Sequence, residues 1–333
     1  MKKTLLIGGS GFIGSHLHEV YPQEKLINLD LVSPAFTYRS TYVQGDIRSY
    51  ADLEGTLKRY SDCDTIINLA AEHQDFGISR EEYMLTNVHG TEQMCKAATN
   101  FGIKKIVFYS SVAVYGNNEV PSSERMKPNP ANDYGDSKLM AEQVLKEWAA
   151  ADSERQVLIM RPVVVYGERN VANMYRLIQQ IQKGRYFHIG KAENIKSIAY
   201  VRNIVEATLF LMNRMQSGVA IYNYADEPQM SIRETADTIV KALGRKPLIS
   251  LPYGLLYFLA LPFDLIIKMT GKNLPISTNR IRKLCTQTYH KAEKIQSTGF
   301  IPPYSNREGL SNMVYWMETG KIKELTARAE LVS

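Results

Sequence analysis

Tyr134 and Lys138 are the residues whose types and spacing most directly suggest chemistry. They stand four positions apart in a segment with helical periodicity that continues to Leu145. One helical turn puts side chains with this spacing on one face, so the phenol and the ammonium are expected to be neighbours. A free tyrosine, with a pKa of about 10, is a poor base at neutral pH, but a nearby cation favours its phenolate. The pair therefore predicts a general base that removes a proton from a hydroxyl.

Ser111 adds a third group to this pair. It follows the apolar run Ile106 to Tyr109, so its hydroxyl is expected at the edge of a sheet where a strand ends. There it can hydrogen-bond the same substrate oxygen that Tyr134 deprotonates. A tyrosine and a lysine with this spacing also occur by chance, and an exposed ring beside a solvated lysine is the alternative interpretation of the pair alone.

A glycine cluster near the start of the chain predicts a dinucleotide site. Gly8-Gly9-Ser10-Gly11-Phe12-Ile13-Gly14 follows the apolar run Thr4 to Ile7 and opens an amphipathic stretch, Ser15 to Tyr21. In such a strand-to-helix turn, glycine lets the backbone approach a pyrophosphate, and the helix N-terminus supplies free N–H groups and positive partial charge. The predicted contacts are Gly8, Gly11, Phe12, Ile13 and Gly14.

Asp30 predicts which dinucleotide binds. It ends the second apolar run, about twenty residues beyond the glycines, where a carboxylate accepts hydrogen bonds from the adenosine ribose and repels a 2′-phosphate. NAD is therefore favoured over NADP, and its positive nicotinamide ring would further favour the Tyr134 phenolate. A turn cap is the alternative role for Asp30, and Arg39 nearby leaves NADP open.

The elements that must position these groups alternate short β-branched runs with helical patterns. The strand candidates are Thr4 to Ile7, Leu26 to Leu29, Tyr42 to Gln44, Thr65 to Leu69, Ile106 to Tyr109 and Val157 to Met160. This order predicts an α/β fold with a doubly wound parallel (Rossmann) sheet and ligands at the carboxyl ends of its strands.

The chain is predicted to divide into two parts. Residues 1–165 plus about 203–230 are expected to form the dinucleotide-binding domain, and about 166–202 and 231–320 a smaller, mostly helical substrate lobe. Residues 321–333 are predicted to be a polar, loosely held tail.

Composition excludes several other classes of protein. The 333 residues are 44% hydrophobic and 22% charged, which is typical of a globular chain. The net charge of +6 is dispersed among 34 acidic residues, so no nucleic acid partner is expected. The glycine cluster follows the first seven residues directly and leaves no room for a signal peptide, which predicts a cytoplasmic location. Cys63, Cys95 and Cys285 lie far apart, which predicts reduced thiols and no metal.

Taken together, the chain resembles the extended short-chain dehydrogenases/reductases of the NAD-dependent epimerase/dehydratase family. Further shared motifs are Thr86-Asn87-Val88-His89-Gly90-Thr91, Arg161-Pro162-Val163-Val164-Val165-Tyr166-Gly167 and Gly299-Phe300-Ile301-Pro302. The resemblance implies that Asn87 orients the helix bearing Tyr134 and Lys138. It also implies cofactor contacts at Asp46, next to the adenine, and at Ile47, Leu69, Ala70, Ala71, Asn87, Tyr134, Lys138, Pro162 and Val163, the last two beside the nicotinamide.

Two departures from the family pattern concern the diphosphate of a nucleotide sugar. The asparagine of the common R-Y-F-N-V-Y-G element is Val164 here, and the R-D-Y-I-H-V-D-D element is replaced by Lys196 to Asn203. The chain also has a narrower resemblance, to bacterial 4-epimerases that act on N-acetylglucosamine linked through diphosphate to undecaprenol. This narrower resemblance accounts for both departures. It rests on Ala71-Glu72-His73, Gly167-Glu168-Arg169-Asn170, Asn194 to Val201, Tyr222-Asn223-Tyr224 and Leu274-Pro275-Ile276-Ser277.

Substrate contacts are predicted at five positions. For the histidine and the three cations among them, the alternative is that they are ordinary surface residues. The five positions are His73, Ser111, Arg169, Lys196 and Arg202, of which the three cations are candidates for pairing with the diphosphate.

The segment Leu251 to Ile267 is nearly as apolar as a membrane span. Pro252 and Pro262 interrupt it and it carries Asp264, so it is not expected to cross a bilayer. One interpretation is a pair of buried helices in the substrate lobe. The other is an interfacial patch, with apolar side chains at the lipid boundary and cations facing anionic headgroups. The cations that follow are Lys268, Lys272, Arg280, Arg282 and Lys283.

The sequence hypothesis is the C4 epimerisation of N-acetylglucosamine to N-acetylgalactosamine on undecaprenyl diphosphate, through a transient 4-keto sugar and bound NAD, for O-antigen and other surface polysaccharides. A UDP-sugar 4-epimerase or 4-keto-reductase is the first alternative. A hydroxysteroid-type dehydrogenase and a non-catalytic NAD-binding regulator are the others, and the complete set of Ser111, Tyr134 and Lys138 argues against the regulator. The sequence leaves open a homodimer and peripheral contact with the inner membrane.

Overall fold

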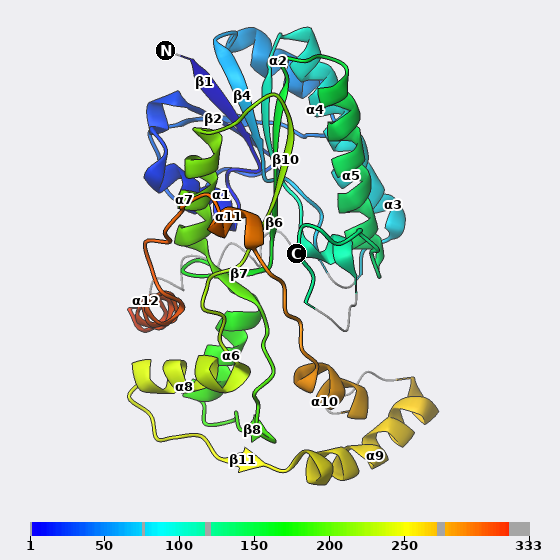
Figure 1. The fold of residues 1–333 in the computed structure, drawn as a ribbon, viewed down its shortest axis with the longest axis vertical. Coiled ribbons are helices and arrows are strands. Elements are labelled where there is room, and N and C mark those ends of the chain that lie inside the picture. The colour runs from blue at the N-terminus through cyan, green and yellow to red at the C-terminus, as the bar shows by residue number, and fades with distance from the viewer. Residues whose placement is uncertain (1, 75–76, 117–120, 272–276, 320–333) are drawn as a thin grey trace.

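A computed structural model of the chain describes residues 2–74, 77–116, 121–271 and 277–319. Its centre is a seven-stranded parallel sheet in the order β10-β6-β5-β4-β1-β2-β3 (Figure 1). The strands are β1 (Lys3–Ile7), β2 (Leu26–Asp30), β3 (Thr41–Gln44), β4 (Cys63–Asn68), β5 (Lys105–Tyr109), β6 (Gln156–Pro162) and β10 (Gly218–Tyr224). The predicted fold class and all six strand candidates are confirmed, whereas β10 was not among the candidates.

The sheet is buried on both faces because its strands alternate their side chains between two cores. Leu6 packs in one core with α1 (Phe12–Val20) and α7 (Val201–Met212), whereas Leu5 and Ile7 pack in the other. The second core also holds side chains of α2 (Tyr50–Arg59), α4 (Gly90–Asn100) and α5 (Asp133–Ala150). Two covered faces explain why the strands are nearly continuous apolar runs.

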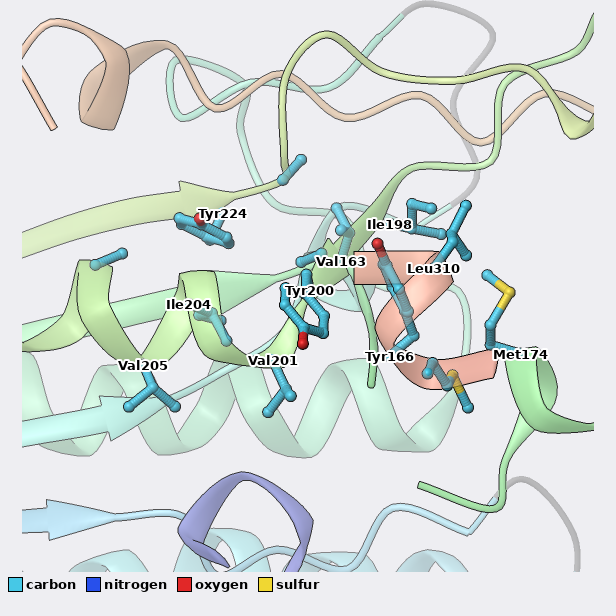
Figure 2. Packing of buried hydrophobic residues seen from close by; sticks show 14 of the residues in the cluster. Val163, Tyr166, Met174, Ile198, Tyr200, Val201, Ile204, Val205, Tyr224 and Leu310 are labelled. Atoms are coloured by element: carbon cyan, nitrogen blue, oxygen red, sulfur yellow. The ribbon is translucent and has the colours of Figure 1, made fainter. Parts of the chain in front are cut away.

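The first core continues from the sheet into the elements that follow it. Figure 2 shows Tyr166, Tyr200 and Leu310 gathered beside α7. The two rings lie 5.6 Å apart, and a Cβ on Gly309 would come within 2.6 Å of the Tyr166 hydroxyl, so this packing needs glycine. The elements joined here are β7 (Val164–Tyr166), β9 (Ile198–Tyr200) and α12 (Asn306–Glu318).

The remaining elements complete the chain. Short helical turns are η1 (Gln23–Lys25), α3 (Arg80–Tyr83), the π-helix η2 (Met84–His89), η3 (Val112–Tyr115) and α11 (Glu293–Gln296). Beyond the carboxyl ends of the sheet strands lie α6 (Asn173–Gln182), β8 (His188–Ile189), α8 (Ile232–Ala242), β11 (Ser250–Leu251), α9 (Tyr253–Thr270) and α10 (Thr278–Cys285) (Figure 1). The chain thus leaves the sheet after β6 and returns for β10; the domain limits given above stay a prediction.

Helix α9 is one continuous helix of 18 residues, although two prolines were expected to divide it. Pro262 lies inside it and Pro252 at its N-cap, where no backbone donor is needed. Ala260 is its one buried residue, so the interpretation as a pair of buried helices is wrong. By length and composition alone α9 is apolar enough to cross a membrane, which the sequence had not led us to expect. The predicted positions Lys272, Leu274-Pro275-Ile276 and 321–333 lie outside the described residues.

Asp264 explains how a carboxylate is accommodated on this apolar helix. Its side chain accepts hydrogen bonds from the backbone N–H of Thr278 at 3.1 Å and from the Thr278 hydroxyl at 2.5 Å. Thr278 is the first residue of α10, so Asp264 ties the two helices together at the α10 N-terminus, where negative charge is favourable.

Candidate active site

A cavity of about 700 Å³ opens at the carboxyl ends of the central strands. Its wall includes residues that end or directly follow β1, β2, β4, β5 and β6. Because β1 and β4 are neighbours from which the chain order runs in opposite directions, this is the switch point where parallel α/β sheets bind ligands.

The glycine turn forms one wall of the cavity and has the geometry that a pyrophosphate requires. Gly8 has φ +77°, and a Cβ there would lie 2.6 Å from the backbone nitrogen of Ala70. A Cβ on Gly14 would lie 2.5 Å from the Gly9 carbonyl oxygen. No side chain caps the N-terminus of α1, and the predicted contacts Gly8, Gly11, Phe12, Ile13 and Gly14 all line the cavity. The helix end therefore offers backbone N–H groups to an anion.

Asp30 lies at the same wall and also stabilises the turn. Its carboxylate accepts hydrogen bonds from the backbone N–H of Ser10 at 2.9 Å and of Val32 at 3.1 Å. Burial raises the pKa of Asp30, and these hydrogen bonds oppose that shift. The carboxylate thus caps a turn and also faces the cavity; its contact with a ribose stays a prediction that this position supports.

Asp46 and Ile47 line the cavity as well, together with Arg48, which the sequence did not single out. Arg48 pairs with Asp46 at 2.6 Å. Although burial acts to raise it, the pKa of Asp46 is held below its usual value by hydrogen bonds and charge from Arg48. The acidic side chain next to the predicted adenine position therefore stays ionised and oriented.

Tyr134, Lys138 and Ser111 all line the same cavity. Helix α5 begins after Asn132, whose side chain accepts the backbone N–H of Gly135, and this cap sets the position of Tyr134 in the first turn. Lys138 is only 1% exposed, and its Nζ lies 4.4 Å from the centre of the Phe108 ring. Burial lowers the pKa of Lys138 to about 7. The structure thus brings the proton-transfer candidates together around one space.

Asn87 acts from behind the wall of the cavity. It sits in the π-helix η2, a form that is frequent at functional sites. Its side chain accepts from the backbone N–H of Glu72 at 2.9 Å and donates to the Ser137 hydroxyl at 2.9 Å. Ser137 in turn donates to the carbonyl of Tyr134 at 2.8 Å. Asn87 is not among the residues that line the cavity, so its position supports the orienting role, and its predicted contact with the cofactor stays a prediction.

The other residues predicted to contact the cofactor also face the cavity, and the contacts themselves stay predictions. Leu69, Ala70, Ala71, Pro162 and Val163 all line the cavity. Backbone hydrogen bonds hold the first of these segments, because Leu69 donates to Ile7 and Ala70 donates to the Asn68 side chain.

The predicted substrate residues separate into two groups. His73 and Ser111 line the cavity. Arg169 instead pairs with Glu19 at 2.5 Å, Arg202 pairs with Glu168 at 3.0 Å, and Lys196 donates to the carbonyl of Lys283 at 3.1 Å. None of these three cations is among the residues that line the cavity in the described part of the chain.

Several residues of the site were not foreseen. Ser110 lines the cavity, and Glu142 and Arg161 form a buried pair behind it. Glu142 could have been found by the same argument that paired Tyr134 with Lys138, because it lies four residues further along α5. Arg161 carried no such signal, since only the fold brings β6 beside α5.

Comparisons with known proteins agree with this geometry. Residues 4–225 match the NAD dependent epimerase/dehydratase family. The chain is 38% identical over 316 residues to the N-acetyl-alpha-D-glucosaminyl-diphospho-ditrans,octacis-undecaprenol 4-epimerase of Escherichia coli O157:H7, and the match covers 94% of each protein. It is 25% identical over 348 residues to a decarboxylating sterol-4-alpha-carboxylate 3-dehydrogenase of Candida albicans, covering 95% of this chain and 98% of that protein.

A solved structure supports the fold independently. The crystal structure of the UDP-glucuronic acid 4-epimerase from Bacillus cereus in complex with NAD superimposes with a TM-score of 0.74 at 21% identity, over 95% of this chain and 99% of that one.

The family match over two thirds of the chain, together with the 38% identical relative, confirms the resemblance, the enzyme class and the NAD cofactor predicted from the sequence. The chain belongs to the NAD dependent epimerase/dehydratase family.

Proposed function

We propose that this protein inverts C4 of an N-acetylhexosamine carried on a polyprenyl diphosphate, interconverting N-acetylglucosamine and N-acetylgalactosamine. The observation that carries the proposal is that Ser111, Tyr134 and Lys138 line one cavity together with the glycine turn. The choice of substrate is supported by the 38% identity, over 94% of both chains, to an epimerase whose name specifies this class of molecule.

The chain's own residues supply the acid–base chemistry and the alignment. The glycine turn would hold NAD, which would supply the acceptor and the donor of the C4 hydride, so there would be no net redox change. The Tyr134 phenolate takes the proton of the C4 hydroxyl, and the Ser111 hydroxyl donates a hydrogen bond to the same oxygen. The Lys138 ammonium favours the phenolate electrostatically. When the 4-keto sugar presents its other face, the Tyr134 phenol can return the proton to the C4 oxygen.

At one position of the cavity wall, an apolar side chain stands where the family's common element is polar. Val164 lines the cavity at the position where the family's common element has asparagine, and its side chain is 52% exposed. Of the polar residues predicted for the substrate, His73 and Ser111 line the cavity. These features support a ligand whose diphosphate is held differently from that of a UDP-sugar.

Three alternatives remain useful as tests. A UDP-sugar 4-epimerase would use the same Tyr134 chemistry, and a 4-keto-reductase would consume external NADH or NADPH. A sterol-type dehydrogenase is supported by a relative at 25% identity, well below the 38% of the epimerase.

We further propose that α9 and α10 attach the enzyme to the cytoplasmic face of a membrane that contains the substrate. Helix α9 carries exposed apolar side chains at helical spacing, namely Leu255, Phe258, Leu259, Leu265, Ile266 and Met269. Lys268, Arg282 and Lys283 are exposed beside them, which suits anionic headgroups. A long polyprenyl tail gives such an enzyme a reason to work at a lipid surface, and a UDP-sugar does not.

The experiment that tests the function is a product assay without added cofactor. The purified protein is incubated with undecaprenyl-diphosphate N-acetylglucosamine and, separately, with UDP-N-acetylglucosamine, and the released sugar is identified. A galacto product from the lipid alone is the expected result. A galacto product from the UDP-sugar alone would move the enzyme to soluble nucleotide sugars, and a requirement for stoichiometric NADH would indicate a reductase.

A further inference from the structure

A buried ion pair lies directly behind the proton-transfer residues. Glu142 is 0% exposed and stands one helical turn beyond Lys138 on α5. Its carboxylate accepts from Arg161 through Nε at 2.8 Å and Nη2 at 2.5 Å. The same carboxylate accepts a hydrogen bond from the Ser110 hydroxyl at 2.6 Å. Glu142 therefore touches the residue next to Ser111 and faces Lys138, although it does not itself line the cavity.

Arg161, the partner of Glu142 in this pair, is also held in place by hydrogen bonds. Arg161 is 3% exposed and donates from Nη1 to the Tyr115 hydroxyl at 2.8 Å. Tyr115 donates to the side chain of Asn223 at 2.8 Å, and Asn223 donates to the carbonyl of Lys291 at 2.9 Å. Polar groups of β6, η3, β10 and the chain before α11 thus fix the guanidinium, which in turn fixes the Glu142 carboxylate.

We propose that Glu142 is a positioning residue of the reaction, which holds Lys138 in its charged form and fixes the segment that carries Ser111. The proposal rests on the function proposed above. Glu142 would thus take part in the reaction without lining the cavity. A buried ion pair contributes little net stability against an apolar replacement, so a role in charge placement is a physical reason to keep one here.

The need for such a residue follows from the burial of Lys138. Taking the ammonium out of water favours the neutral amine, and burial lowers the pKa of Lys138 to about 7, against which the negative charge of Glu142 acts. A neutral lysine would no longer favour the Tyr134 phenolate. Without Glu142, the fraction of charged Lys138 at neutral and alkaline pH would fall.

The other groups around Lys138 do not replace this effect. Phe108 of β5 presents the face of its ring at 4.4 Å, and Tyr134 lies on the same helix. Ser110 is neutral, and Arg161 and Lys146 approach the Glu142 carboxylate from β6 and α5, Lys146 at 4.0 Å. Among the described residues, Glu142 is the charged group that raises the Lys138 pKa.

The test compares Glu142→Gln with Glu147→Gln, an exposed position on the same helix. The amide introduced by Glu142→Gln keeps an acceptor for Ser110 or Arg161 but loses the charge. The pH dependence of kcat is measured on whichever substrate the wild-type enzyme epimerises. For Glu142→Gln we expect the alkaline limb to move toward lower pH by about one unit, which is about a tenfold loss of kcat at alkaline pH and a smaller loss on the acidic side. Glu142→Asp, which keeps the charge, should keep the wild-type optimum even where kcat falls.

A second readout needs no turnover. In the protein stripped of cofactor, the unfolding free energy is compared with and without Lys138→Met across pH, which isolates the titration of Lys138. In the Glu142→Gln background, this difference in unfolding free energy should begin to change at a pH about one unit lower. If Glu142→Gln alone does not fold, the double variant Glu142→Gln with Arg161→Gln is used, because it leaves no unpaired buried charge. The Lys138 pKa should still shift in the same direction, since Glu142 is the group that acts on Lys138.

The outcomes separate the two proposals. An active wild type whose optimum and Lys138 titration are unchanged by Glu142→Gln overturns the role of Glu142 and leaves the epimerase standing. A wild type that yields no galacto product from either sugar overturns the proposed function, while the titration of Lys138 still decides whether Glu142 controls its charge.

Discussion

Exposed apolar residues on α9 make membrane binding sensitive to substitutions that leave the fold intact. Phe258 and Met269 are 70% and 76% exposed. Burying each of them in a lipid interface should therefore contribute most of the free energy of burying a whole apolar side chain, about 1–2 kcal/mol. Replacing both with serine should cost about 2–4 kcal/mol of binding free energy, which is roughly a 30- to 700-fold weaker affinity. Because neither side chain is buried, the unfolding free energy should change by less than about 0.5 kcal/mol each.

The assay is co-sedimentation with vesicles that contain anionic phospholipid, at low and at high salt. The matched control is Ile301→Ser with Tyr315→Ser, two exposed apolar residues outside α9 that are 83% and 70% exposed. We expect the control to bind like the wild type, and wild-type binding to weaken with salt because cations of α10 contribute. Equal binding of the α9 variant and the wild type, or an equal loss in the control, would refute the reasoning.

Three further predictions concern the cavity and the acid range. Tyr134→Phe should lower kcat by about 10²- to 10⁴-fold without changing the NAD content of the purified protein, and full activity would exclude Tyr134 as the base. Asp30→Ala should weaken NAD about 10- to 100-fold while NADP weakens less, as calorimetry can measure; an unchanged ratio would remove Asp30 from cofactor selection. Burial lowers the pKa of His18 to about 4, so the unfolded chain binds a proton that the fold does not. Stability should therefore fall as pH drops below about 6.5, by about 2 kcal/mol from His18 at about pH 5, and urea unfolding of His18→Gln should show a correspondingly shallower slope against pH.

Most of the sheet and the cofactor cleft could be predicted because local patterns encode them. The glycines from Gly8 to Gly14 are required by backbone geometry at one turn, and Asp30 ends the strand that follows. Both signals lie within the first 30 residues of the chain, so no knowledge of distant packing was needed. The spacing of Tyr134 and Lys138 likewise predicts their proximity because one helix carries both.

Contacts between distant elements could not be predicted from the sequence. Arg169 and Arg202 were expected as free cations for a diphosphate, but the fold supplies each with a carboxylate, Glu19 and Glu168. Those pairs join residues up to 150 positions apart, which no periodicity can reveal. The prolines that seemed to divide Leu251 to Ile267 did not do so, since one lies at a helix start and the helix accommodates the other.

The position of β10 has a consequence for how this chain is made. β6 is an inner strand only because residues 218–224 return to pair with it along its whole length. During synthesis, the first six strands emerge with β6 as an open edge until about 60 more residues have followed, and open edges invite pairing with other chains. A truncated chain that ends after β6 would keep that edge. Residues 1–165 are therefore a poor choice for separate expression, because the strand that seals their sheet lies beyond the first part of the substrate lobe.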